Sequence, residues 1–95
     1  MLIETPYKVG DTVSIKLTSG EEILARLEDE KDDGLVLHKP LMLTATGQGL
    51  GLAPFMFTIN PDAKVNIKHT SIVCVNKTIE DMAKQYISNT TGIAV

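Results

Sequence analysis

The residues of this chain that could carry chemistry are two histidines, one cysteine and a run of acidic side chains. His38 and His69 are the only imidazoles, and neither stands in a pattern with a plausible serine or cysteine nucleophile. The acidic residues between Glu28 and Asp33 could bind a divalent cation, but they lack the spacing of a calcium-binding loop. A solvated connection is the simpler interpretation. The sequence therefore predicts no catalytic residues, no metal site and no cofactor, and we expect the protein not to be an enzyme.

Cys74 is the only cysteine and lies in an apolar run, where a small buried side chain is the simplest interpretation. One thiol cannot form a disulfide within the chain, so a reducing compartment fits the sequence best. No apolar run reaches the ~18–20 residues that span a membrane. Met1–Gly10 also lacks the charged start and apolar middle of a signal peptide. We therefore expect a cytoplasmic protein without membrane contacts.

Three glycines, Gly47, Gly49 and Gly51, lie within the segment Thr44–Pro54. Their spacing matches neither a P-loop nor a dinucleotide-binding fingerprint, and no Lys-Ser or Lys-Thr pair follows them. The segment is therefore predicted to be a flexible loop and not a nucleotide site. A net charge of -3 also argues against non-specific binding of nucleic acid, which lysine and arginine drive. A local basic site remains open, because several lysines follow the acidic segment.

The elements that position these residues are predicted to form one domain over residues 1–95. The chain is 43% hydrophobic but only 4% aromatic, so Val, Ile, Leu and Met must build its core. Apolar residues alternate with polar ones in two runs that Ser19-Gly20 separates: Val13, Ile15, Leu17, and then Ile23, Ala25, Leu27. Period two on both sides of a glycine predicts a hairpin of two strands, each with one buried face.

The remaining strands are predicted from shorter apolar runs, at Leu35–Leu43, Phe55–Ile59 and Ser71–Asn76. Pro40 is expected to bend the first of them, and Asn60–Ala63 has the composition of a turn. Val65 and Ile67 alternate briefly before Lys68-His69-Thr70, which is expected to be a short corner. Short strands with close turns predict an all-β fold with a terminal helix, in which a small bent five-stranded barrel spans about residues 9–76.

A helix is predicted over about residues 78–89. Thr78 is expected to cap it by accepting a hydrogen bond from the amide of Asp81. The helix carries an apolar stripe at helical spacing: Ile79, Met82, Ala83, Tyr86 and Ile87. The stripe is expected to dock on the barrel, and a partner-binding face is the alternative. The apolar tail, Ile93-Ala94-Val95, could pack on the same subunit or on a neighbour.

Two stretches of the sequence resemble the motifs of a known family. The first, Val9–Leu37, contains Gly10-Asp11, the alternating hydrophobes, Gly20 and then Leu35 and Leu37. It resembles the first motif of the Sm/LSm (Sm-like) superfamily. The second, Val65–Val75, is similar to the second Sm motif. Its Lys68-His69 pair matches the Lys-His of the bacterial, Hfq-like members. The organisation as a whole is also similar to small Sm-like proteins of marine phages, which would place the protein in the cytoplasm of the host cell.

The resemblance implies a bent SH3-like barrel whose fourth and fifth strands pair between subunits to close a ring of six or seven copies. The interface would then include the last strand, at Ser71, Ile72, Val73, Cys74 and Val75. It also implies a ring-forming RNA-binding module, in which the corner formed by Lys68 and His69 contacts RNA near the pore. A polar turn at a strand junction is the simpler interpretation of this pair.

The sequence departs from the family in several respects, one of which is that the usual amino-terminal helix is expected to be short or absent. Ala25 stands where the family usually has glycine. The segment Glu28–Gly34, which would be the base-binding loop, has neither the asparagine of Sm proteins nor an aromatic residue that could stack on a base. An alternative therefore stays open, that of an oligomeric scaffold or protein-interaction module with the Sm fold and no RNA binding.

Overall fold

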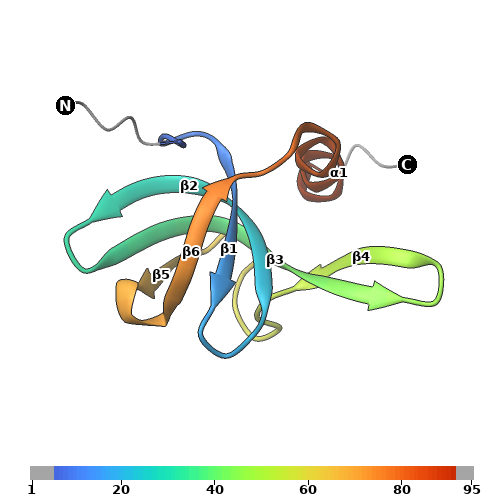
Figure 1. Ribbon diagram of the computed structural model, residues 1–95, viewed down its shortest axis with the longest axis horizontal. Helices are drawn as coiled ribbons and strands as arrows, with labels where there is room; N and C mark the ends of the chain where they lie inside the picture. Colours follow the sequence, from blue (N-terminus) through green and yellow to red (C-terminus); the bar gives the residue numbers. More distant parts are fainter. Residues whose placement is uncertain (1–5, 92–95) are drawn as a thin grey trace.

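The computed structural model describes residues 6–91 and, for Thr91, the backbone alone. This part of the chain is mostly β-structure followed by one helix (Figure 1). The strands are β1 (Thr12–Leu17), β2 (Glu22–Lys31), β3 (Gly34–Thr46), β4 (Gly49–Pro54), β5 (Lys64–Lys68) and β6 (Ile72–Lys77). A short 3-10 helix, η1 (His69–Ser71), joins β5 to β6, and the chain then forms α1 (Glu80–Thr91). The predicted class, strands followed by a terminal helix, is confirmed.

The strands form one open antiparallel sheet in the order β4-β3-β2-β1-β6, and β5 pairs with β3. Strand β3 pairs with β2 along one edge, while Gly34–His38 pair with β5 and Leu41–Thr46 with β4 along the other. Lys39 and Pro40 lie between these two parts of β3, and Lys39 has a positive φ of 52°. The predicted bend at Pro40 is therefore present. Within residues 6–91 no strand pair joins β5 to β6, so the sheet is not closed into a barrel.

The β1–β2 hairpin supplies most of the core. Its inward-facing side chains are buried: Val13, Ile15, Leu17, Ile23, Ala25 and Leu27. Two side chains of β3, Leu35 and Leu37, complete this core. Gly20 has a φ of 106°, a conformation that glycine adopts without steric strain, and it turns the chain between the two strands. The predicted alternation and turn are confirmed, because one face of each strand enters the core; Leu24, on the opposite face of β2, is buried as well.

The segment from Thr44 to Pro54 is a hairpin and not the flexible loop that was predicted. Strand β4 continues the sheet beyond β3, and the hairpin projects from the rest of the molecule (Figure 1). The hydroxyl of Thr46 donates a hydrogen bond of 2.9 Å to the carbonyl of Gly49, which has a φ of 120°. The glycines therefore form the turn and part of a strand instead of a flexible connection.

The predicted strand at Phe55–Ile59 is wrong, since these residues form an irregular loop that continues to Ala63. Phe55 packs against the core, but the side chain of Phe57 is 79% exposed, so the run does not bury one continuous face. The turn at Asn60–Ala63 is confirmed by a hydrogen bond of 2.8 Å from the amide of Ala63 to the carbonyl of Asn60. Strand β2 is also longer than expected: it runs to Lys31, and the acidic connection is reduced to a turn at residues 32–33.

The helix is anchored on the sheet by Tyr86, whose side chain is 2% exposed. Its hydroxyl donates toward the carbonyl oxygens of Lys39 and His38, at 2.7 and 2.9 Å, and accepts the amide of Arg26 at 3.1 Å. The rest of the predicted apolar stripe docks only in part, because Ile79 and Ile87 are exposed. Tyr86 thus ties α1 to β2 and to the bend of β3.

The expected cap at Thr78 is not formed as predicted. The Thr78 side chain is buried and its hydroxyl shares a hydrogen bond of 2.8 Å with Ser14 of β1, while the helix begins at Glu80. The apolar tail Ile93-Ala94-Val95 lies outside the described residues.

Replacing Tyr86 by phenylalanine is expected to lower the free energy of unfolding by about 1–3 kcal/mol, because buried backbone groups lose their partner. Burial raises the pKa of Tyr86 to about 12, above its ordinary value of 10.0. The folded form thus holds this proton more tightly, so the contribution is complete below pH 10 and is lost as the pH rises toward 12. Chemical denaturation at pH 7 and across pH 9–11 measures both effects. The partly buried Tyr7 provides the control Tyr7→Phe, which should be close to neutral; equal losses in the two variants would contradict the anchoring role.

Candidate functional site

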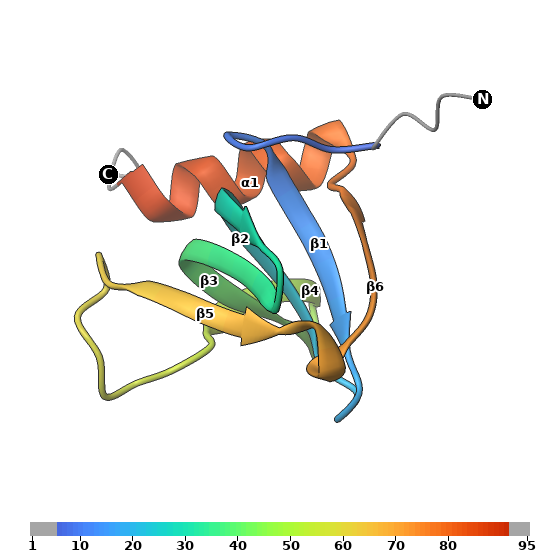
Figure 2. The same ribbon diagram turned by 90° about the vertical axis from the view of Figure 1, so that its left-hand side faces the viewer.

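Three strands in the described part of the chain are edges of the sheet, namely β4, β5 and β6, and the last two are joined by η1. Within residues 6–91, β5 pairs only with β3 and β6 pairs only with β1. They meet at η1 and run away from it in different directions (Figure 2). Each edge presents backbone N–H and C=O groups that can pair with another strand. The residues predicted to form a subunit interface lie here, with Ile72, Val73, Cys74 and Val75 in β6 and Ser71 in η1.

The side chains of β6 divide between the core and the solvent. Ile72 and Val75 pack against the core, whereas Val73 is 62% exposed. Cys74 is exposed, so the prediction that it is a buried hydrophobe is wrong. Its partner in the register is Lys16 of β1, which faces outward, and the apolar run is covered on one face alone. The exposed apolar part of β6 is therefore surface that a second chain could cover.

The Lys68-His69 corner is held against the turn between β2 and β3. The backbone amide of His69 donates to the carbonyl of Asp33 at 2.9 Å, and its Nε2 lies 3.2 Å from the carbonyl oxygen of Lys31. The ammonium group of Lys68 donates to the Asp33 carboxylate at 2.9 Å. Both side chains are exposed, as a nucleic-acid contact requires, but each already has a protein partner.

The electrostatics of this corner are dominated by carboxylates. The hydrogen bond from Lys68, and then its positive charge, hold the pKa of Asp33 below its ordinary value. The turn and the residues next to it include two lysines, Lys31 and Lys68. They also include four acidic residues: Asp29, Glu30, Asp32 and Asp33. The corner therefore carries net negative charge, which opposes the approach of a polyanion.

A second polar cluster lies where β2 and β3 pair. The Glu28 carboxylate lies 3.4 Å from Nδ1 of His38 and 3.8 Å from Nε of Arg26. Arg26 and His38 are partners in the register, so the cluster follows from strand pairing that the sequence alone does not reveal. The three side chains place one carboxylate between an imidazole and a guanidinium group, with no serine or cysteine among them. This arrangement is a partly buried polar cluster on the sheet surface.

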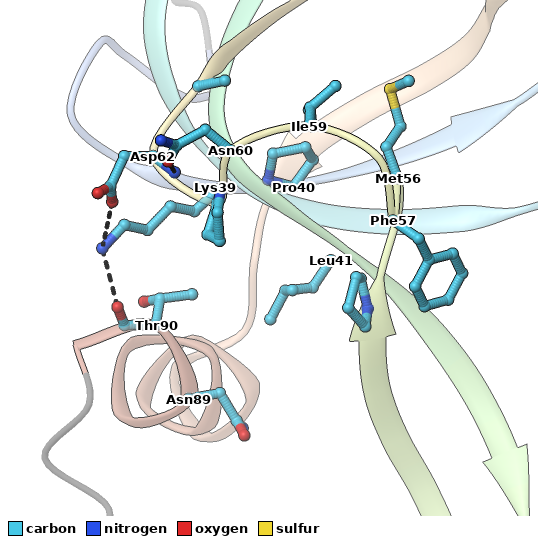
Figure 3. A pocket seen from close by; sticks show the side chains of 13 residues that line it. Lys39, Pro40, Leu41, Met56, Phe57, Ile59, Asn60, Asp62, Asn89 and Thr90 are labelled. Atoms are coloured by element: carbon cyan, nitrogen blue, oxygen red, sulfur yellow. Dashed lines mark hydrogen bonds and ion pairs between the residues drawn. The ribbon is translucent and has the colours of Figure 1, made fainter.

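A cavity of about 350 Å³ lies between the bend of β3, the loop after β4 and the last turn of α1 (Figure 3). Its wall is mostly apolar, with Pro40, Leu41, Pro54 and Ile59 among the residues that line it. The Lys39 ammonium lies at one side, 2.9 Å from the carbonyl oxygen of Thr90 and 3.6 Å from the Asp62 carboxylate. Sequence reasoning missed this cavity, because the three segments that form it are far apart in the chain.

The described part of the chain contains few other features of a recognised site. No group of three or more His, Cys, Asp or Glu side chains in residues 6–91 is arranged to hold a metal ion. None of its helices has the length and apolar character needed to cross a membrane. Compared with models of known protein families and with curated proteins, the sequence has no match.

Proposed function

We propose that this protein is a ring-forming structural module of the Sm-like type, in which β5 of one copy pairs with β6 of the next. The observation that carries the proposal is the position of the edge strands β5 and β6. They are the strands that follow one another at the Lys68-His69 corner, and each has a strand neighbour on one side only within residues 6–91. Pairing between copies would satisfy the backbone groups of both edges at once.

The order of the strands supports the Sm-like part of the proposal. The first strand pairs with the last, and the part of β3 before its bend pairs with β5. If the β4 hairpin is regarded as an extension of β3, the other five strands have the order of a bent barrel whose last two strands are not joined to each other. A neighbouring copy would then complete the barrel, with β5 and β6 in the roles of its fourth and fifth strands.

The two edges are different surfaces, so the proposed contact is head-to-tail. Such contacts generate closed rings when the rotation between copies closes, and open filaments when it does not. A ring of six or seven copies is what the resemblance of the two motifs implies. The partly exposed apolar side chains of β6, with Val73 foremost, would be covered in each contact.

The charges favour a scaffold over an RNA-binding ring. The Lys68 ammonium is paired with Asp33, and the carboxylates around the corner outnumber the lysines. Binding of RNA phosphates depends on free cationic groups that release counterions. In an assembly, every subunit would contribute the carboxylates of its corner together with Lys68. The ring would therefore not gather positive charge alone.

RNA binding at Lys68 and His69 remains the second candidate, and one observation favours it. Both side chains are exposed at the corner that joins β5 to β6. A ring would therefore place one Lys68-His69 pair from each subunit at equivalent positions around its axis. If RNA replaced Asp33 as the partner of Lys68, the pairs could act together.

Fluorescence anisotropy with short uridine-rich and adenine-rich RNAs separates the two candidates. The scaffold predicts no saturable binding at moderate salt, both for the natural chain and for the variants Lys68→Ala and His69→Ala. Salt-dependent binding that either variant weakens, with the mass of the assembly unchanged, would contradict the scaffold and establish the RNA-binding candidate.

A further inference from the structure

The cavity beside Lys39 has the size and composition of a small-molecule site. Its volume of about 350 Å³ falls within the range of ligand pockets, which combine apolar walls with few polar groups. Its walls come from β3, the loop 55–63 and the end of α1 (Figure 3). None of the residues that line it belongs to β5 or β6, so the cavity is separate from the proposed assembly edges.

Lys39 supplies the one cationic group of this lining. Its side chain is 28% exposed, with the ammonium directed toward Thr90 and Asp62 (Figure 3). An ammonium group has three hydrogens to donate. Within residues 6–91, Lys39 makes one hydrogen bond, to the carbonyl of Thr90, because the Asp62 carboxylate is 3.6 Å away. The half-buried Lys39 ammonium thus retains N–H groups that could donate hydrogen bonds to an anionic group in the cavity.

The backbone at Lys39 is held in an unfavourable conformation. A φ of 52° is uncommon for a residue with a side chain, and such strain persists only where the surroundings enforce it. The Tyr86 hydroxyl enforces it here by bonding the carbonyls of His38 and Lys39. Residues held in this way concentrate at binding and catalytic sites. The strain positions the Lys39 side chain at the cavity.

The chemistry of the lining selects a class of ligand. Proline, leucine and isoleucine side chains favour an apolar body, and a single ammonium favours a single negative charge. The neighbouring Asp62 carboxylate would repel a phosphate dianion more than a carboxylate. Asp62 is mostly exposed, so it can leave Lys39 for solvent at little cost when a ligand carboxylate takes its place.

From these observations we infer that the cavity binds a small amphipathic carboxylate, with its apolar chain against Pro40, Leu41 and Ile59 and its carboxylate on the Lys39 ammonium. Octanoate is a suitable probe, and octanamide is its uncharged counterpart of nearly the same size. NMR titration of the ¹⁵N-labelled chain with each compound locates the contact by its shifted amides. We expect shifts of the amides of residues 39, 41, 89 and 90 and of the non-proline residues in 55–63. The affinity for octanoate should be at least about tenfold above that for octanamide.

Three variants make the test specific. Lys39→Met keeps the apolar stem and should bring the two affinities together, whereas Lys84→Met, at an exposed lysine of α1, should leave the preference intact. Asp62→Asn keeps Lys39 in place and removes its competing partner, so octanoate should bind about two- to fivefold more tightly. Equal affinities for the two probes, shifts confined to other surfaces, or a preference that survives Lys39→Met would overturn the inference. The test of octanoate binding reads chemical shifts and affinities, whereas the proposed ring is tested by mass. Failure of one is therefore distinguishable from failure of the other.

Discussion

Replacing Gly34 by alanine is expected to lower the free energy of unfolding by at least about 2–3 kcal/mol, because β3 and β5 must move apart. Gly34 starts β3 opposite Lys68. A Cβ atom at this position would lie 2.2 Å from the carbonyl oxygen of Ile67 and 3.0 Å from the Cα of Lys68. Both neighbours are backbone atoms, which cannot give way as a flexible side chain would. The separation would also pull the His69 amide from the carbonyl of Asp33.

Chemical denaturation of Gly34→Ala measures this loss, and Gly47→Ala is its matched control. Gly47 lies in the turn between β3 and β4, where an added Cβ meets no atom within 4 Å. We expect the control to change stability by less than about 0.5 kcal/mol. Equal stabilities of the two variants would show that β5 does not lie against Gly34 as described.

Replacing Val73 by lysine is expected to convert the assembled protein into a single chain without unfolding it. Val73 is 62% exposed in β6, so the isolated subunit should tolerate a charged side chain there. In the proposed contact the same position lies next to β5 of a neighbour, which itself carries Lys64 and Lys68. A charge on an edge strand prevents pairing with another strand, and like charges would add to the effect.

Leu50→Lys is the control for this prediction, because Leu50 is 59% exposed and lies in β4, away from both β5 and β6. Light scattering should report the mass of one chain for Val73→Lys and the mass of the natural protein for Leu50→Lys. Circular dichroism should be the same for both variants. An assembled Val73→Lys protein would exclude β6 from the interface.

The parts of the fold that the sequence predicts are those with one buried face. In β1 and β2 each alternate side chain enters the core, and the pattern is therefore visible without a structure. The β4 hairpin has no such pattern, because Gly49, Leu50 and Gly51 bury little. The opposite error occurs at Phe55–Ile59, where an apolar run predicts a strand but belongs to an irregular loop.

Cys74 illustrates a different limit. An apolar strand predicts cover on both faces, but the described chain covers β6 on one face only. The proposed neighbour would supply further cover, which a single chain cannot show.

The candidate site was predictable only where its residues are adjacent in the sequence. Lys68 and His69 form a visible pair, but the salt bridge to Asp33 joins residues 35 positions apart. The cavity at Lys39 likewise needs the end of α1, which lies about fifty residues from the bend of β3. The charge pairing that favours the proposed scaffold is set by the register of the strands, which the sequence alone does not show.

The mass of the natural protein in solution tests the central claim most directly. Size-exclusion chromatography with light scattering, over a range of protein concentrations, should give one species of six or seven times the mass of the chain. Addition of a short uridine-rich RNA should leave that mass unchanged. A single chain at all concentrations would contradict the proposed pairing of β5 with β6.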